Sequence, residues 1–211
     1  MAAVDETASA LDGRSLGKRG AATRRRLLDA TGALLESNGL RDLRVVDIAR
    51  EVGTSPATFY QYFRDVEEAV LALAESVGEQ TAPLVDVLEA QWSGEFGLDR
   101  ARALVDGFLR FWDEHRAILR TRNLAAQEGD QRFRDVRNSS LQPITEGISR
   151  KVAENGVPGL APYAAAAALV AMMERMAAFH GDLEAYGASR ADVVETTARI
   201  VFQTVTGRLS P

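Results

Sequence analysis

Residues 43–73 read LRVVDIAREVGTSPATFYQYFRDVEEAVLAL, and this stretch decides the fold. Its first part has Val45, Ile48 and Val52 at the spacing that puts side chains on one face of a helix. Gly53 follows, and glycine readily adopts the left-handed conformation that a sharp turn after a helix requires. The stretch therefore begins with a short helix that ends in a tight turn.

A second helix is expected directly after this turn. Ser55 suits the N-cap position and Pro56 the first helical position, so we expect this helix to begin there and to run through Phe63. Phe59 and Phe63 are four residues apart, which places both rings on one face, against the preceding helix. The pattern predicts a helix-turn-helix whose second helix is short and aromatic.

Helical periodicity continues on both sides of this stretch, and no alternating strand pattern occurs. The fold class predicted is therefore all-α. Apart from the two helices above, the expected helices are those at 22–38, from 65 to near Pro83, at 84–92, across the apolar stripe 104–119, one or two within 122–155 with a break at 127–130, and at 162–180 and 191–207.

Composition limits the possible functions of the chain. Of 211 residues, 46% are hydrophobic and 26% charged, which is typical of a soluble globular protein. There is no cysteine, and His115 and His180 are the only histidines, so we expect no disulfide, metal or cofactor. The N-terminus has no signal-peptide pattern, and the longest apolar run, 161–173, is too short for a membrane span. The expected location is cytoplasmic.

Charge is distributed unevenly along the chain, whose net charge is −5. From Arg14 to Arg64, ten Lys and Arg stand against five Asp and Glu, a local charge of +5; from Asp65 onward the local charge is −7. The basic N-terminal part is the candidate for contact with phosphates, although a solvated basic face would give the same pattern. Residues 1–20 show no periodicity and are expected to form a flexible basic arm.

The segment from Thr23 to Leu73 resembles the DNA-binding region of the tetracycline-repressor (TetR) family. The resemblance rests on a core helix ending in Gly53, a short turn, the Phe-Tyr-x-Tyr-Phe pattern of 59–63 and the acidic-apolar helix after it. It implies a three-helix DNA-binding domain at 21–65 and a larger helical regulatory and dimerisation domain at 66–211. The implied function is that of a ligand-responsive transcriptional regulator, foremost a repressor that binds a pseudo-palindromic operator as a dimer.

The predicted DNA contacts follow from both the resemblance and the helix geometry. A helix in the major groove presents its exposed, N-terminal residues to the base edges, while its other face is anchored on its own domain. Hydroxyl and carboxamide groups suit phosphate and base-edge hydrogen bonds, but core packing is the alternative for Tyr60 and Tyr62. The predicted DNA-binding residues are Arg24, Arg44, Val45, Ser55, Pro56, Ala57, Thr58, Tyr60, Gln61, Tyr62 and Arg64.

The chain departs from the family pattern at one position. Val66 stands where the family commonly has a lysine that reaches a phosphate, and Arg64 lies two residues earlier. The resemblance also implies phosphate contacts from the basic residues 18–19 and 24–26, which solvated charges would explain nearly as well. Backbone anchoring at the start of the fourth helix is therefore in question.

The acidic C-terminal part holds a cluster of methionines and aromatic residues. Such a cluster can form an adaptable pocket for a small hydrophobic or aromatic effector, although an ordinary helical core has the same composition. The predicted pocket residues are Trp92, Phe108, Phe111, Trp112, His115, Met172, Met173, Met176 and Phe179. His115 is the candidate for orienting the effector by one hydrogen bond.

Small residues on the last two helices suggest a homodimer. Ala164, Ala168, Ala171 and Ala178 permit close helix packing, and the resemblance implies a four-helix interface with a second subunit. An enzyme is the first alternative function, but the sequence has no nucleophile set, metal-ligand pair or phosphate-binding glycine loop. The second alternative is an interaction module that has kept the fold and lost DNA binding.

Overall fold

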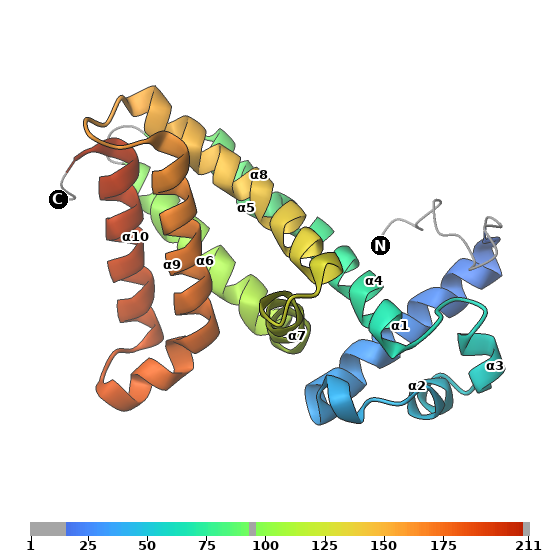
Figure 1. The fold of residues 1–211 in the computed structure, drawn as a ribbon. Coiled ribbons are helices and arrows are strands. Elements are labelled where there is room, and N and C mark those ends of the chain that lie inside the picture. The colour runs from blue at the N-terminus through green and yellow to red at the C-terminus, as the bar shows by residue number, and fades with distance from the viewer. Residues whose placement is uncertain (1–15, 93–95, 209–211) are drawn as a thin grey trace. The chain divides into compact units, whose positions relative to one another are not determined.

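The computed structural model describes residues 16–92 and 96–208, and the regular secondary structure within these ranges consists of helices, without a strand (Figure 1). The predicted all-α class is therefore confirmed, while residues 1–15 of the predicted arm lie outside the described residues. The helices are α1 (Lys18–Asn38), η1 (Leu40–Asp42), α2 (Val45–Glu51), α3 (Pro56–Phe59), α4 (Val66–Gly78), η2 (Glu79–Thr81), α5 (Ala82–Glu89), α6 (Phe96–Glu114), α7 (Arg116–Gln127), α8 (Gln131–Asn155), α9 (Pro162–Leu183), η3 (Glu184–Tyr186) and α10 (Arg190–Thr206).

The helices group into two compact units. The first comprises the described residues up to Val77 together with Ala117–Val136; the second comprises Gly78–Arg116 and the described residues from Arg137 onward. The first unit thus contains the helix-turn-helix and also α7, which the sequence predicts to belong with the regulatory part. Where the functional domains begin and end remains a prediction.

The core of the first unit lies where α1, α2 and α3 meet. Leu27, Ile48 and Phe59 are completely buried there, and α1 and α3 both contact α2. Gly32 of α1 lies close to the side chain of Leu73 of α4. A Cβ atom added at this glycine would be 3.4 Å from Leu73 Cδ2, which is ordinary van der Waals contact. Helix α4, which follows the helix-turn-helix in sequence, therefore packs on α1.

The second unit is built around α6, which packs against α5, α9 and α10. Helices α9 and α10 lie side by side and run in opposite directions (Figure 1). Arg102 of α6 donates to both carboxylate oxygens of Glu195 of α10, at 2.7 and 3.0 Å. This hydrogen bonding lowers the pKa of Glu195 to about 2. An ion pair therefore reinforces the main packing contact of this unit.

Three helix boundaries differ from the sequence-based expectation. Helix α1 begins at Lys18 instead of residue 22, since Gly17 has the extended conformation of an N-cap and its carbonyl accepts a bond from the Ala21 N–H. The expected helix over 104–119 is interrupted at His115, whose N–H bonds back three residues to Trp112. Helix α4 ends at Gly78, and Pro83 lies in the first turn of α5.

The third helix is shorter than predicted. The sequence predicts a helix through Phe63, but α3 ends at Phe59. The N–H groups of Gln61 and Tyr62 bond to the carbonyls three residues back, which converts the last turn to the tighter 3-10 pattern. The N–H of Phe63 nevertheless bonds to the carbonyl four residues back, that of Phe59, as in an α-helix. Both phenylalanines are therefore still buried in the core.

Within the described ranges, no helix combines the length and the apolar character needed to cross a bilayer.

Candidate nucleic-acid interface

The turn between α2 and α3 is shaped by Gly53. Its φ of +69° lies in the left-handed region, where a Cβ would be strained. The N–H groups of Gly53 and Thr54 bond back to the carbonyls of Arg50 and Ala49, at 3.0 and 2.9 Å, and so satisfy the end of α2. The left-handed turn predicted from the sequence is present.

Ser55 begins α3 as predicted. Its extended backbone places Oγ where it accepts a hydrogen bond from the Thr58 N–H at 3.2 Å, and Pro56 occupies the first helical turn. The hydroxyls of Ser55 and Thr58 are also 3.1 Å apart and share a hydrogen bond. The cap fixes the direction in which the N-terminal end of α3 leaves the turn.

The inner face of this segment anchors it to the unit. Phe59 is 0% and Phe63 1% exposed, and their ring centroids lie 5.5 Å apart. Ile48 and Val52 of the preceding helix segment are buried as well. The prediction that both phenylalanines face the core is therefore confirmed.

The outer face carries the residues predicted to contact DNA. Tyr60 is 52% exposed and its ring meets that of Phe59 edge-to-face, so the alternative that Tyr60 belongs to the core is wrong. Thr58 and Tyr62 are half-buried. The exposed members of the predicted set in this segment are Ser55, Pro56, Ala57, Tyr60 and Gln61.

At the start of α2, the predicted contacts are also accessible. Arg44 is exposed and has the extended backbone of an N-cap residue, without a side-chain cap. Val45 is half-buried and the neighbouring Val46 is 48% exposed. This helix end and the outer face of α3 thus belong to the same unit and both present side chains to solvent.

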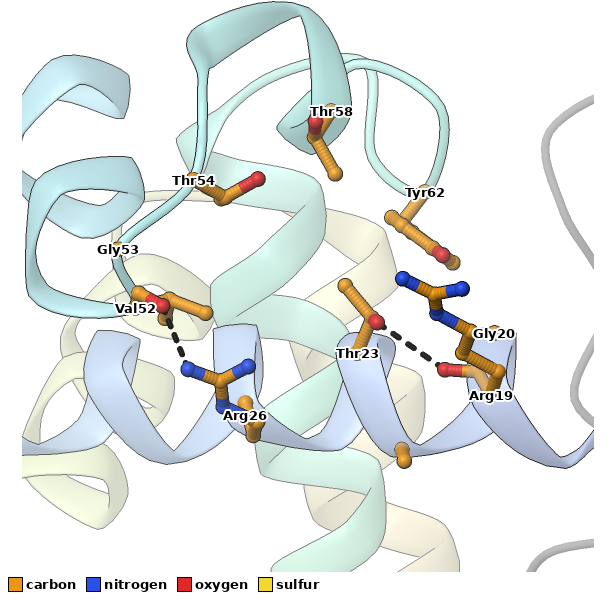
Figure 2. Close-up of a pocket in the computed structure, with 10 residues that line it drawn as sticks. Arg19, Gly20, Thr23, Arg26, Val52, Gly53, Thr54, Thr58 and Tyr62 are labelled. Carbon is orange, nitrogen blue, oxygen red and sulfur yellow. Dashed lines mark hydrogen bonds between the residues drawn. The ribbon is translucent and has the colours of Figure 1, made fainter.

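The arginines of α1 have different surroundings. Arg24, a predicted phosphate contact, has its guanidinium carbon 5.3 Å from the centroid of the Phe63 ring, a cation–π contact. Arg26 donates a hydrogen bond of 2.5 Å to the carbonyl oxygen of Val52 (Figure 2). Through these two arginines α1 therefore contacts the helix-turn-helix at two points, at Val52 and at Phe63, a role that sequence spacing alone does not reveal.

A hollow of about 590 Å³ lies between the N-terminal half of α1 and the helix-turn-helix (Figure 2). Two guanidinium groups and four hydroxyl groups line it, together with backbone at two glycines. The lining residues are Arg19, Gly20, Ala22, Thr23, Arg26, Val52, Gly53, Thr54, Thr58 and Tyr62. Of the residues predicted to contact DNA, Thr58 and Tyr62 line the hollow, and so do Arg19 and Arg26 from the basic segments expected to contact phosphates.

The predicted effector-pocket residues lie in the second unit, with unequal burial. Trp92, Phe108, Trp112 and Met173 are buried, whereas Phe111, His115, Met172 and Met176 are half-buried. Phe179 was expected in the interior but is 39% exposed. It differs in helical phase from the buried residues of α9, and the guanidinium of Arg175 lies 3.7 Å from its ring centroid.

The two histidines have distinct environments. The ring of His115 meets that of Phe111 edge-on at 4.9 Å, and burial lowers the pKa of His115. His180, which was not among the predicted pocket residues, is buried; its Nδ1 lies 3.0 Å from the Ala177 carbonyl and its Nε2 3.5 Å from Asp113 Oδ2. His115 therefore lies against an aromatic ring, whereas His180 lies between a carbonyl and a carboxylate.

Two protein-family models match the chain. The model described as "Bacterial regulatory proteins, tetR family" covers residues 27–73, and the model described as "Tetracyclin repressor-like, C-terminal domain" covers residues 84–211. The chain belongs to the TetR family. It is therefore a transcriptional regulator with a helix-turn-helix DNA-binding domain, and members of this family bind DNA and dimerise.

Individual TetR-family proteins resemble the chain over most of its length. An uncharacterized HTH-type transcriptional regulator of Haemophilus influenzae is 22% identical over 183 residues, which is 86% of each chain. A TetR/AcrR-family regulator of Thermobifida fusca is 23% identical with a TM-score of 0.64, covering 85% of this chain and 96% of its own. The regulator FadR of Bacillus subtilis, solved with stearoyl-CoA, is 13% identical with a TM-score of 0.66, covering 87% and 98%. These solved structures share the fold.

The departure from the TetR pattern at Val66 lies beside a group of ion pairs. Asp65 caps α4, accepting a bond of 2.8 Å from the Glu68 N–H. The Arg64 side chain, 74% exposed, binds the carboxylate of Glu68 at 3.1 Å. The cation nearest in sequence to the missing lysine is thus paired with a neighbouring carboxylate.

A second arginine reaches the first turn of α4 from far along the chain. Arg132 of α8 binds Glu67 at 3.2 Å and Asp130 at 2.6 Å. Its hydrogen bond to Asp130 lowers the pKa of that carboxyl group. The acidic first turn of α4 is therefore partly neutralised by arginines on both sides, one local and one distant in sequence.

Proposed function

We propose that this regulator is a repressor that binds a pseudo-palindromic operator as a dimer and is released by a small apolar or aromatic effector. The observation that carries the proposal is the division of residues 55–63 into two faces. Phe59 and Phe63 are fully buried, whereas Tyr60 is half exposed between them. A segment anchored in this way can enter the major groove without losing its own support.

The chemistry of the outer face supports sequence-specific DNA binding. Ser55, Thr58, Tyr60, Gln61 and Tyr62 carry hydrogen-bonding groups, which suit base edges and phosphate oxygens. Pro56 and Ala57 are exposed and apolar, which suits contact with thymine methyl groups. Arg44 and Val45 begin α2 and are proposed to lie near the DNA backbone, as are Arg24 and Arg64.

The outer surface of α9 and α10 supports a dimer through these helices. Ala164, Ala168 and Ala171 are exposed on α9 at spacings that align them on one face, and Phe179 and Ile200 are 39% and 40% exposed. Small residues flanked by large apolar ones permit close packing against a second copy. A two-fold dimer would place its recognition helices about 34–36 Å apart, one turn of DNA.

The second unit is the proposed site of the effector. Its interior combines buried aromatic residues with Met173, while Met172 and Met176 are half-buried, and methionine side chains adapt to ligands of different shape. The fold shared with FadR of Bacillus subtilis, which was solved with stearoyl-CoA, supports an effector with a large apolar part. Replacing Met176 by Trp should fill this region and prevent release by effector while leaving DNA binding intact.

A salt titration of DNA binding tests the repressor proposal. The purified protein is titrated onto a duplex from the region upstream of its own gene and onto an unrelated duplex of equal length. We expect tighter binding to the first, with an affinity that falls as salt rises because counterions are released from the phosphates. Equal, salt-independent or absent binding would instead favour an interaction module that has lost DNA recognition.

A further inference from the structure

The two tryptophans of the chain differ in the hydrogen bonding of their indole groups. Both are buried, each 3% exposed. Trp92 Nε1 donates to the Val87 carbonyl at 3.1 Å, in the last turn of α5, where carbonyl groups lack a partner within the helix. Among the described residues, by contrast, Trp112 Nε1 has no hydrogen-bond partner. Buried N–H groups in folded proteins are almost always paired, so this exception calls for a physical explanation.

Trp112 belongs to α6, the central helix of the second unit, which packs against α9. It lies on the buried face of α6 together with Phe108, one turn earlier. The next residue, Asp113, has Oδ2 3.5 Å from Nε2 of His180. His180 ends a buried face of α9 that also contains Met173. Trp112 therefore lies where the aromatic residues of α6 and a buried methionine of α9 meet, in the region of the proposed effector site.

We propose that the indole N–H of Trp112 donates a hydrogen bond to a carbonyl oxygen of the effector. This inference rests on the proposed release by a small apolar or aromatic effector. It narrows the class of that effector to apolar molecules that carry a neutral carbonyl group, such as a ketone, an ester or a lactone. An indole N–H can donate but not accept, so the complementary group of the ligand has to be an acceptor.

The neighbouring backbone does not supply this acceptor. Within α6 and α9, carbonyl groups accept bonds from N–H groups four residues later in the same helix. The carbonyl of Ala177, on the buried face of α9, also lies 3.0 Å from His180 Nδ1. The acceptor for Trp112 therefore comes from a molecule that enters between the helices. The flexible side chain of Met173 can change its conformation to admit such a molecule.

The charges of this region favour a neutral acceptor over an anion. Asp113 follows Trp112 directly and binds Arg116 at 2.8 Å. Glu174 of α9 is buried and binds Arg137. An anionic ligand would add a negative charge to a region that already contains two carboxylates, each with its cation engaged, and burial strengthens that repulsion. A carbonyl oxygen accepts the hydrogen bond without bringing a charge.

Nitrogen–proton NMR of the indole groups tests the proposal, because the chain has only two of them. Either W92F or W112F assigns the two signals. The probes are acetophenone and methyl nonyl ketone, each compared with the hydrocarbon in which a methylene group replaces the carbonyl oxygen. Both ketones should move the Trp112 proton signal downfield, as a new hydrogen bond does, and leave the signal of the already bonded Trp92 in place. The hydrocarbons should cause no downfield shift.

The NMR outcomes separate this inference from the proposed function. Equal shifts with a ketone and its hydrocarbon would overturn the hydrogen bond and still support an apolar effector site. A nuclear Overhauser contact between water and the Trp112 indole proton, before any probe is added, would assign this N–H to a bound water and also overturn it. If no probe shifts any signal of the second unit, the proposed effector site fails, and the inference fails with it.

The affinity of W112F, measured by calorimetry, gives a second test. Phenylalanine keeps an aromatic ring and removes the N–H, so W112F should bind acetophenone roughly three- to tenfold more weakly than the wild type. It should bind isopropenylbenzene, the hydrocarbon of the same shape, about as well. The matched control W92F removes an N–H that is paired within the chain and should keep the preference for the ketone. An undiminished preference in W112F would contradict the proposal.

Benzoate tests the charge of the acceptor. It resembles acetophenone in size and shape but carries a carboxylate. The wild type should therefore bind benzoate more weakly than acetophenone, because Asp113 and Glu174 repel it. Tighter binding of benzoate would overturn the neutral class of effector.

Discussion

The guanidinium of Arg26 donates a hydrogen bond of 2.5 Å to the carbonyl oxygen of Val52. This bond joins α1 to the C-terminal end of α2, one residue before the turn at Gly53. It therefore fixes the position of the turn after which residues 55–63 begin. We expect Arg26 to be a positioning residue, because an N–H of its guanidinium is used within the protein.

Replacing Arg26 by Ala should weaken DNA binding without changing its salt dependence. The loss of a part-buried, charged hydrogen bond to the Val52 carbonyl should lower the free energy of unfolding by about 1–3 kcal/mol. Urea unfolding measures this change, and the salt titration separates it from a phosphate contact. A reduced salt slope in R26A would mean that Arg26 reaches the DNA.

Replacing Tyr60 by Ala should abolish specific binding and leave stability nearly unchanged. Tyr60 is 52% exposed, so truncation creates no cavity, whereas the control F59A removes a completely buried ring. We expect F59A to lower the free energy of unfolding by about 3–5 kcal/mol. Thermal unfolding and duplex binding of both variants check this contrast, and a comparable loss of stability in Y60A would contradict it.

Replacing Glu68 by Gln should strengthen DNA binding. The carboxylate of Glu68 pairs with Arg64, while the amide of Gln can still accept the hydrogen bond from the Arg64 N–H. Removing the negative charge frees Arg64 for the phosphate that Val66 cannot reach, so the salt slope should rise by about one. If E68Q binds like the wild type, and R64A does too, Arg64 takes no part in binding.

Stability should depend on pH through His115. Burial lowers its pKa in the folded protein, so the folded state binds fewer protons than the unfolded chain. Stability should therefore decrease as the pH falls through the unfolded pKa of roughly 6.5. The difference in Tm between pH 7.5 and pH 5.5 should be smaller in H115N than in the wild type. An equal difference would assign the dependence to other groups.

Replacing Ala171 by Glu should convert the dimer to a monomer. Ala171 is exposed on α9, and a carboxylate there would be buried unpaired in the proposed interface. A153E is the matched control, since Ala153 is exposed on α8. Light scattering should give the monomer mass for A171E only. A dimeric A171E would place the interface on another surface.

The helix-turn-helix is predictable from the sequence because its determinants are local. The turn depends on Gly53, the cap on Ser55 and Thr58, and the buried face on the four-residue spacing of Phe59 and Phe63. Each of these interactions spans only a few residues. The early end of α3 was not predicted, because the composition of residues 60–62 does not distinguish α from 3-10 hydrogen bonds.

Contacts between distant segments could not be predicted. Arg26 and Val52 are 26 residues apart in sequence, and Arg132 and Glu67 are 65 apart. The runs of arginine in α1 look alike in sequence, although Arg24 lies on Phe63 and Arg26 binds a carbonyl. Only the packing of α1 against the helix-turn-helix gives these arginines their different surroundings.

The first unit is discontinuous in sequence, since it takes α7 and the start of α8 from Ala117–Val136. A gene truncated after Val77 would therefore encode only part of this unit. Such a fragment would contain the whole helix-turn-helix but would lack Arg132, the partner of Glu67. Expressing this compact unit whole and by itself therefore means joining two stretches of the gene, those for the residues up to Val77 and for Ala117–Val136, with a linker.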